Sequence, residues 1–304
     1  MAGLAAKPNQ DKPTLGISLM LLAYFCFSCI DTSAKWLVLR GFPVIQVAFM
    51  RYFGHFIISL GIIFKGGISA ERLGTPKIGL VIFRGLLLLV GTVANFLALK
   101  YISLTLTSTI MFSAPLIICA LSGPLLGERV GVWRWSAVGV GFIGVLVAMR
   151  PFDESFHWAM LLSLMTTVSF ALYTILTRKL SDQVASETLQ LYGGGIGSMV
   201  LLPFAIHSWQ MPETGLQWGL MLLLGFLGWL GHQLMTRAHG LADASRLTPY
   251  MYVFFLYMTF WSLWIFDTLP DGWTLAGAAI IITSGLVVWF RETLASRVSL
   301  SNQS

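Results

Sequence analysis

Three charged residues, Asp31, Lys35 and Arg51, lie within stretches that are otherwise apolar. A carboxylate in such surroundings is costly unless a base or hydrogen-bond donors accompany it. Lys35 follows Asp31 by four residues and therefore shares a helix face with it. Asp31 and Arg51 lie at similar distances from the turn between the first two apolar stretches, which predicts a depth of roughly 12 Å for both. An acid and two bases placed in this way can exchange a proton or hold a charged solute.

The predicted pair of Asp31 and Arg51 has two interpretations. In the functional one, Asp31 titrates or releases Arg51 during a cycle, so that a proton or a substrate carboxylate replaces the internal partner. In the structural one, the pair is a static clamp between two helices, because buried ion pairs often serve packing or specificity alone. Lys35 competes for the same carboxylate in both interpretations.

The composition shows that this chain is solvated by lipid. Hydrophobic residues make up 56% of the sequence and charged residues only 11%, whereas about a quarter of residues are charged in soluble domains. Runs such as 79–99 and 218–235 are apolar on nearly all sides, which excludes the alternating pattern of a transmembrane β-barrel. The net charge of +6 therefore reports membrane topology, and we expect a bilayer rather than nucleic acid as the partner.

The elements that must position the charges are ten apolar stretches, each long enough to cross a bilayer at roughly 20 residues per crossing. They are predicted at residues 14–38, 43–64, 77–100, 103–126, 131–149, 157–178, 186–208, 215–238, 242–266 and 271–291. With only short loops between them, these stretches predict an all-α integral membrane protein.

Basic residues are distributed unequally between the two sets of loops. The loops and tails on the side of the N terminus contain Lys7, Lys12, Lys65, Arg72, Lys77, Arg129, Arg134, Arg178, Lys179, Arg237, Arg246, Arg291 and Arg297, against Lys35, Arg40, Lys100 and Arg150 on the other side. Because cytoplasmic loops carry the excess of Lys and Arg, we expect both termini in the cytoplasm. The predicted location is a bacterial inner membrane, crossed many times.

Two sets of five stretches resemble each other. Residues 95–100 read NFLALK and residues 232–237 read HQLMTR, and later matches keep a similar offset. The predicted units are a tail at 1–13, a first repeat at 14–149, a periplasmic linker at 150–156, a second repeat at 157–291 and a tail at 292–304. A unit with an odd number of spans enters the bilayer upside down when it is copied, so we expect inverted repeats around a central cavity.

Several short strings occur in a characteristic order: ALKY at 98–101, SAPL at 113–116, LGER at 126–129, and then a fifth stretch that contains glycine. In these strings the chain resembles the EamA-type repeat of the drug/metabolite transporter superfamily, as a ten-helix exporter. The resemblance implies export or exchange of small metabolites, commonly amino acids, and it matches Lys35 and Arg51 to basic positions of the family. In the second repeat, Gly194 occupies the position equivalent to Arg51, and Asp267 replaces the glutamate of LGER. The two halves can therefore differ in function.

Polar and aromatic side chains within the stretches are candidates for the cavity wall. They are Tyr24, Phe27, Ser28, Asn95, Phe112, Phe170, Tyr173, Trp229, His232, Tyr250 and Tyr252. Asn95 and His232 occupy matching repeat positions, and the mixture suits an amphipathic solute such as a neutral amino acid. The alternative is that the aromatic side chains pack helices together and the polar ones join helices by hydrogen bonds.

Proline predicts helix breaks at two places. Pro115 lies near the middle of the fourth stretch and Pro249 in the early part of the ninth. Each removes a backbone hydrogen bond, and a broken helix at the midplane is where a transporter can place a hinge or expose carbonyls to its substrate. The alternative is a harmless kink whose freed carbonyl is satisfied by neighbouring groups.

Other apparent motifs indicate no chemistry. Cys26 and Cys29 form a CxxC, but no further Cys or His is close in sequence, and GVGFIG at 139–144 matches GxGxxG without the strand that a dinucleotide site requires. No motif of a hydrolase or an ATP-driven pump is present. We therefore expect no catalytic residue, no metal and no cofactor, and the sequence indicates no obligate protein partner.

Together these features predict a secondary transporter that exports or exchanges small organic solutes by alternating access. Amino acids, aromatic or other neutral ones, are the expected substrates. Drugs or other metabolites of the same family are the first alternative. An integral-membrane enzyme acting on a lipid ranks lower because the acids in the loops are scattered, and a channel would more readily present a polar ring in a symmetric oligomer.

Overall fold

The computed structural model describes residues 12–65, 74–75, 77–126, 132–180, 183–242 and 247–301, and the regular structure within them is helical. The helices are α1 (Pro13–Leu39), α2 (Val44–Lys65), α4 (Ile78–Leu99), α5 (Leu104–Met111), α6 (Ala114–Leu126), α7 (Val132–Met149), α8 (Ala159–Leu180), α9 (Ser186–His207), α10 (Gly215–Leu241), the 3-10 helix η1 (Thr248–Tyr252), α12 (Val253–Phe266) and α13 (Gly272–Ser301). Eight of the described spans are long and apolar enough to cross a membrane, and two shorter apolar helices, Trp135–Met149 and Tyr250–Phe266, complete the ten.

The predicted spans therefore correspond to these helices, with two of them divided and one extended. α5 and α6 together form the fourth span, and η1 continues into α12 to form the ninth. α13 continues to Ser301, past the predicted end of the tenth span at residue 291. Of the sequence features discussed above, the glycine, glutamate and arginine of LGER lie outside the described residues, as do Lys7, Arg72 and Arg246.

The two repeats are inverted with respect to each other. In the second span of each repeat, α2 and α9, Tyr52 lies against Gly197 and Phe56 against Gly194, so the residue numbers rise along one helix as they fall along the other. The last spans, α7 and α13, are also antiparallel. The Oγ of Ser284 donates to the carbonyl of Ala137, while Gly277, earlier in α13, lies against Ala148, later in α7. Equivalent helices that run in opposite directions define the inverted five-helix repeats that the sequence predicts.

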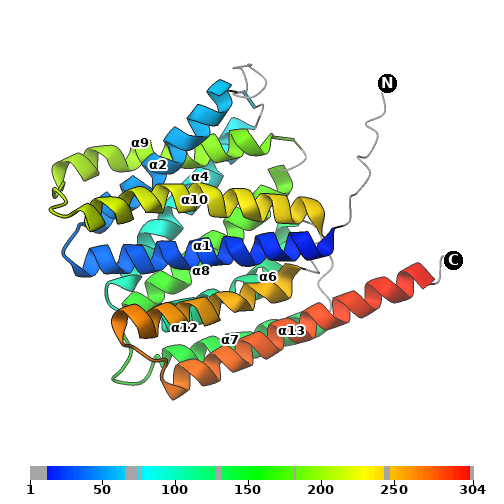
Figure 1. Cartoon of the computed structure of the whole chain (residues 1–304). Helices are drawn as coiled ribbons and strands as arrows, with labels where there is room; N and C mark the ends of the chain where they lie inside the picture. Colours follow the sequence, from blue (N-terminus) through cyan, green and yellow to red (C-terminus); the bar gives the residue numbers. More distant parts are fainter. Residues whose placement is uncertain are drawn as a thin grey trace, which may run out of the picture.

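Helices of the two repeats interdigitate rather than forming separate halves. α1 packs on α10, and α4 packs on α8, as exchange of the repeats by a two-fold axis requires. Figure 1 shows α1 and α10 side by side across the whole molecule. Glycine permits the closest approach: a Cβ on Gly225 of α10 would lie 2.6 Å from the Cα of Gly54 in α2. The buried core accordingly contains residues of both repeats, such as Leu37, Leu104 and Met258.

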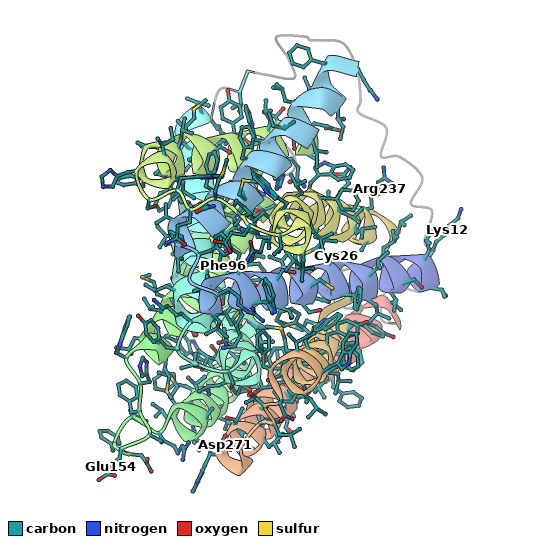
Figure 2. All side chains as sticks on the ribbon, turned by 60° about the vertical axis from the view of Figure 1, so that its left-hand side comes forward. Lys12, Cys26, Phe96, Glu154, Arg237 and Asp271 are labelled. Carbon is teal, nitrogen blue, oxygen red and sulfur yellow. The ribbon has the colours of Figure 1, made fainter. Side chains whose placement is uncertain are left out.

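The two ends of the helical bundle differ in their charged residues. The start of α1 and the end of α13 lie at the same end, on the right in Figure 1. In Figure 2, Lys12 and Arg237 lie at one end, while Glu154 and Asp271 lie at the other. The placement of the basic end in the cytoplasm remains a prediction from the charge distribution.

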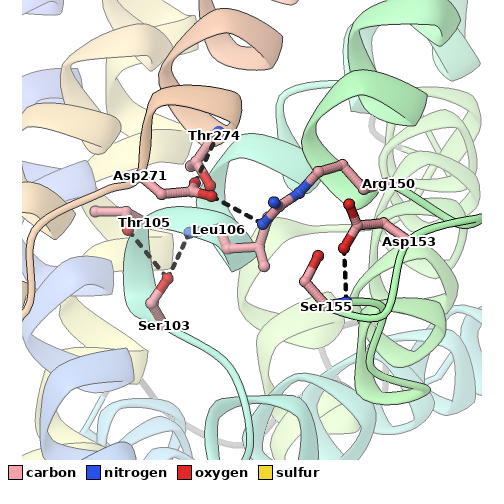
Figure 3. Close-up of polar contacts among 8 residues, drawn as sticks. All are labelled: Ser103, Thr105, Leu106, Arg150, Asp153, Ser155, Asp271 and Thr274. Atoms are coloured by element: carbon pink, nitrogen blue, oxygen red, sulfur yellow. Dashed lines mark hydrogen bonds and ion pairs between the residues drawn. The ribbon is translucent and has the colours of Figure 1, made fainter.

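Helix caps fix the opposite end, as Figure 3 shows. The Oγ of Ser103 accepts from the backbone N–H of Leu106 at the start of α5, and Asp271 accepts from the N–H of Thr274 at the start of α13. Asp271 also pairs with Arg150, which follows α7, at 2.9 Å. This ion pair joins the last spans of the two repeats.

A cavity between the repeats

A cavity of about 140 Å³ lies between the repeats, which is the volume of roughly five water molecules. Its wall consists of Tyr24, Phe27, Ile30, Asp31, Arg51, Leu87, Leu88, Gly91, Thr92, Asn95, Phe96, Met111, Phe112, Ala114, Thr166, Phe170, His232, Met235, Met251 and Phe254. These residues come from both repeats, so the cavity lies at the seam that the inverted fold predicts.

Asp31 is held in the wall by an amide rather than by a base. The Nδ2 of Asn95 donates to the Oδ1 of Asp31 at 2.9 Å, which joins α1 to α4. Both side chains are buried, and the Oδ1 of Asn95 has no hydrogen-bond partner of its own. A neutral donor orients the carboxylate and leaves its charge available to a solute.

Arg51 faces the same cavity and is held by a hydroxyl. Its Nη1 donates to the Oγ1 of Thr92, and the hydroxyl of Tyr52 is hydrogen-bonded to the same oxygen at 2.8 Å. The expected ion pair between Arg51 and Asp31 is not formed in this structure, which corrects the contact that both the functional and the static-clamp interpretation assumed. The reason is that Thr92 and Asn95, one turn apart on α4, engage the two charges separately.

Lys35 does not compete for Asp31, contrary to expectation. Its ammonium donates to the carbonyls of Leu99 and Ile102, at 2.6 and 2.7 Å, where α4 ends. A cation at a helix C terminus satisfies carbonyls that lack helical partners and interacts favourably with the helix dipole. Lys35 also lies 5.5 Å from the ring of Phe266, at the end of α12. It therefore connects α1, α4 and α12 beside the cavity.

Six of the predicted cavity residues line the wall: Tyr24, Phe27, Asn95, Phe112, Phe170 and His232. The others do not line it. Ser28 is fully buried and accepts a hydrogen bond from Trp261, and the hydroxyl of Tyr173 accepts one from Arg84 at 2.6 Å. Tyr252 packs against Phe112 at 5.2 Å between ring centroids, Trp229 packs against Phe226 at 6.4 Å, and Tyr250 lies half-buried in η1.

Both proline positions coincide with irregular helix. α5 ends at Met111 and α6 begins at Ala114, so Phe112 and Ser113 interrupt the fourth span directly before Pro115. Pro249 lies within the 3-10 helix η1 that precedes α12. Met111, Phe112 and Ala114 line the cavity beside the first break, and Met251 does so beside the second. A hinge function for either break remains a prediction.

The structure adds wall residues that the sequence analysis missed. Thr92 is the most informative, because it precedes Asn95 by three residues and so lies on the same helix face. That spacing of polar residues was a signal available in the sequence. No comparable spacing pointed to the other wall residues, since small polar and apolar residues occur throughout these helices. Examples are Met111, Thr166, Met235 and Phe254.

The cavity lies in the middle part of the bundle, and its wall reaches from Met251 near the start of the ninth span to Phe96 near the end of α4. Beyond Phe96, Lys35 and Leu99 are buried where α1 meets α4. Among the described residues no group of three or more His, Cys, Asp or Glu side chains is placed to hold a metal ion.

The EamA-like transporter family model matches this chain twice, over residues 14–150 and 157–290. The chain belongs to the EamA-like transporter family. It is therefore a multi-pass membrane protein and a transporter of small molecules, and the resemblance found in its sequence strings is confirmed. The family fold, two repeats around a cavity, is the one that the structure shows.

Several bacterial proteins are similar to this chain over most of its length. An S-adenosylmethionine uptake transporter of Rickettsia felis is 30% identical, covering 92% of this chain and 94% of that protein. A riboflavin transporter of Vibrio cholerae is 28% identical, covering 95% and 97%. A pseudopaline exporter of Pseudomonas aeruginosa is 25% identical, covering 88% and 94%. A solved crystal structure shares the fold, with a TM-score of 0.64 at 16% identity over 95% of this chain and 99% of that one.

Proposed function

We propose that this EamA-like transporter carries small zwitterionic organic solutes by alternating access, namely amino acids and metabolites that contain an amino-acid group. One observation supports the proposal above all others. Asp31 and Arg51 line the same cavity with opposite charges and are not paired with each other. A solute that carries an ammonium group and a carboxylate complements both charges at once, which offsets the cost of holding them in the membrane.

The rest of the wall suits an apolar or flat group next to the charged head. Tyr24, Phe27, Phe112, Phe170 and Phe254 supply aromatic surface, and Met111, Met235 and Met251 supply side chains that adapt to different shapes. Aromatic and other neutral amino acids fit this description. S-adenosylmethionine, which a relative's name mentions, also combines an amino-acid head with a flat ring system.

We propose export or exchange as the direction, with energy from the solute gradient or from protons. Among the described residues, Asp31 is the one carboxylate that lines the cavity. Coordination of sodium by several carboxylates is therefore disfavoured. The names of the relatives include both an uptake transporter and an exporter, so they do not indicate a direction.

The test is counterflow in liposomes that contain the purified protein. The liposomes are loaded with unlabelled L-phenylalanine, L-methionine or S-adenosylmethionine, and entry of the same labelled compound is measured. We expect saturable uptake of at least one of the three, and competition among them. Protein-free liposomes and riboflavin, a flat solute without an amino-acid head, serve as controls.

The outcomes separate the alternatives. The protein could carry riboflavin or a cationic drug and none of the three solutes with an amino-acid group. That result would contradict the proposal and support a transporter of drugs or other metabolites. Flux that does not saturate, or that does not respond to solute on the opposite side, would indicate a channel.

A further inference from the structure

Two buried histidines lie next to Arg51 at the wall of the cavity. His55 belongs to α2 and His232 to α10, their exposed fractions are 4% and 5%, and their ring centroids are 5.9 Å apart. His232 lines the cavity directly, and His55 lies behind it. The Nε2 atom of each ring is buried without a hydrogen-bond partner.

Arg51 contributes a third such nitrogen. Its Nε is buried without a partner, although its Nη1 donates to Thr92. A buried donor without an acceptor is costly, and native structures rarely leave several of them together unless another molecule completes the site. The Nε of Arg51 can only donate, and an imidazole Nε2 donates in the tautomer in which it carries the proton. An acceptor that enters the cavity would satisfy these nitrogens.

The charges around the histidines indicate that this acceptor is an anion. The titratable and polar groups packed around them are Arg51 and Tyr52 on α2, Arg84 on α4, Tyr173 on α8 and Gln190 on α9. Arg84 donates to Thr177, Tyr173 and the carbonyl of Leu189, so it too has only neutral partners. Among the described carboxylates Asp31 also interacts with Arg51, but one acid against the two arginines leaves an excess of positive charge that a negative group would offset.

Aromatic packing alone does not explain His232. Its ring contacts Phe27 at 5.1 Å and Tyr173 at 6.2 Å between centroids, and a phenylalanine would provide the same contacts without burying nitrogen. The nitrogens are costly in a purely structural role. They are useful if they bind a group that enters with the solute.

We infer that Arg51 and His232, with His55 behind them, form the subsite for the carboxylate of the transported solute. This inference rests on the proposed function and divides the cavity into two parts: Asp31 and Asn95 face the ammonium group, and the Arg51–His232 subsite faces the carboxylate. The guanidinium supplies the charge, and the imidazoles supply hydrogen bonds in a setting from which water is largely excluded.

The experiment compares solutes that differ only in the carboxylate. Labelled L-phenylalanine, L-methionine and S-adenosylmethionine are competed in counterflow by the unlabelled acid and by its decarboxylated amine. In the native protein the acid should compete about tenfold or more better than the amine, as expected for a hydrogen-bonded carboxylate. His232→Phe and Arg51→Lys should each bring the ratio close to one, whereas His232→Gln, which keeps an amide donor, should retain part of it.

His207→Phe is the matched control, because His207 is exposed at the end of α9 and the same substitution there leaves the cavity intact. Monodispersity and thermal unfolding establish which variants are folded. If His232→Phe does not fold, the comparison is made with His232→Gln instead. Native protein that carries none of the acids contradicts both the proposed function and the subsite. Acids and amines that compete equally, or His232 and Arg51 variants that keep the native ratio, overturn the subsite alone.

Discussion

At the cavity wall, neutral side chains hold both charges in place without cancelling them. Asn95 orients Asp31 and Thr92 orients Arg51, and the two partners lie one turn apart on α4. Had Asp31 and Arg51 paired directly, a solute would have to break that ion pair before binding. The observed arrangement avoids this cost.

Replacing Asp31 tests whether its charge takes part in transport. Asp31→Asn keeps a side chain that can hydrogen-bond to Asn95 but removes the negative charge. We expect transport of ammonium-bearing solutes to fall about tenfold or more, because a hydrogen bond to a charged group contributes about 1.5 to 3 kcal/mol. We also expect any pH dependence of transport to disappear, which counterflow measured across a pH series would show.

Asp153→Asn is the control for the loss of an acidic residue, since Asp153 is exposed in the loop after α7. Its carboxylate accepts a hydrogen bond from the N–H of Ser155, which holds the pKa of Asp153 below its usual value. A pH profile that is the same in native protein and Asp31→Asn would exclude a titrating role for Asp31.

The sequence predicted the charged residues of the site but not their partners. Asp31 and Arg51 were found because a charge in an apolar stretch is rare and costly. Their pairing depends on the rotation of α1, α2 and α4 about their axes, and a helix that is apolar on nearly all sides gives no pattern from which to derive it. The same ambiguity explains why Tyr250 and Trp229 were predicted to line the cavity.

Among the elements, the divided fourth span is placed to bend beside the cavity. Pro115 lies in the first turn of α6, where a missing N–H costs no helical hydrogen bond. Pro115→Ala should allow α5 and α6 to join through Phe112 and Ser113. We expect transport to slow severalfold, while thermal stability stays the same or rises, because a continuous helix gains a backbone hydrogen bond.

Pro203→Ala provides the comparison for this prediction. Pro203 lies inside α9 and is exposed, away from the cavity. The two variants are compared in turnover by counterflow and in melting temperature. Equal turnover in native protein and Pro115→Ala, with α5 and α6 joined, would show that the break is a harmless kink.

The ion pair between the ends of α7 and α13 has a predictable dependence on pH. Burial raises the pKa of Asp271, but the hydrogen bonds from Thr274 and the charge of Arg150 outweigh this effect and hold the pKa below its usual value. A lowered pKa in the folded state stabilises the protein above the ordinary pKa of the carboxyl group, and this stabilisation is lost as the pH falls below that value. The pair is largely exposed, so we expect about 1 kcal/mol or less.

Unfolding of the native protein and Asp271→Asn, followed from about pH 6 to about pH 3, measures this contribution. The difference in free energy of unfolding should be largest at the higher pH and should decrease as the pH falls through the lowered pKa of Asp271. Glu154→Gln, in the exposed loop before α8, controls for loss of an acidic residue at the same end. A difference that stays constant over the range would mean that the charge of Asp271 does not contribute to stability, either through Arg150 or through the hydrogen bonds from Thr274.

Helix positions were the part of the fold most readily predicted, because hydropathy marks the stretch that crosses the membrane. The extension of α13 beyond residue 291 was missed for the same reason, since hydropathy falls where the membrane ends and not where the helix ends. The interruption at Phe112 and Ser113 was predicted from Pro115, because proline lacks a backbone N–H and disturbs the helix at its own position whatever surrounds it.

In the whole molecule, the inverted repeat follows from the odd number of spans in each unit, and the sequence predicted it on that basis. The state that the structure shows could not be predicted, because one sequence must serve both states of an alternating-access cycle. In this state α1, α4 and α12 meet around Lys35.

Lys35 should stabilise this state relative to one in which these three helices separate and the cavity opens at the end that contains Lys35. Lys35→Met keeps the length and apolar part of the side chain but removes the ammonium group that binds the carbonyls of Leu99 and Ile102. A hydrogen bond to a charged group contributes about 1.5 to 3 kcal/mol, so its loss should shift the two populations by about tenfold. The opening at the end that contains Lys35 would then become more frequent.

Thiol labelling from each side of the membrane measures this shift. Cys26, Cys29 and Cys119 are replaced by alanine, and Met111→Cys places a single thiol in the cavity wall. Relative to the otherwise native protein, Lys35→Met should raise the rate at which an impermeant maleimide reacts from the end that contains Lys35. Lys100→Met, an exposed lysine at that same end, should leave both rates unchanged. If Lys35→Met behaves like Lys100→Met, the contacts of Lys35 support helix packing in both states, and the closure must depend on the buried apolar residues around Leu99.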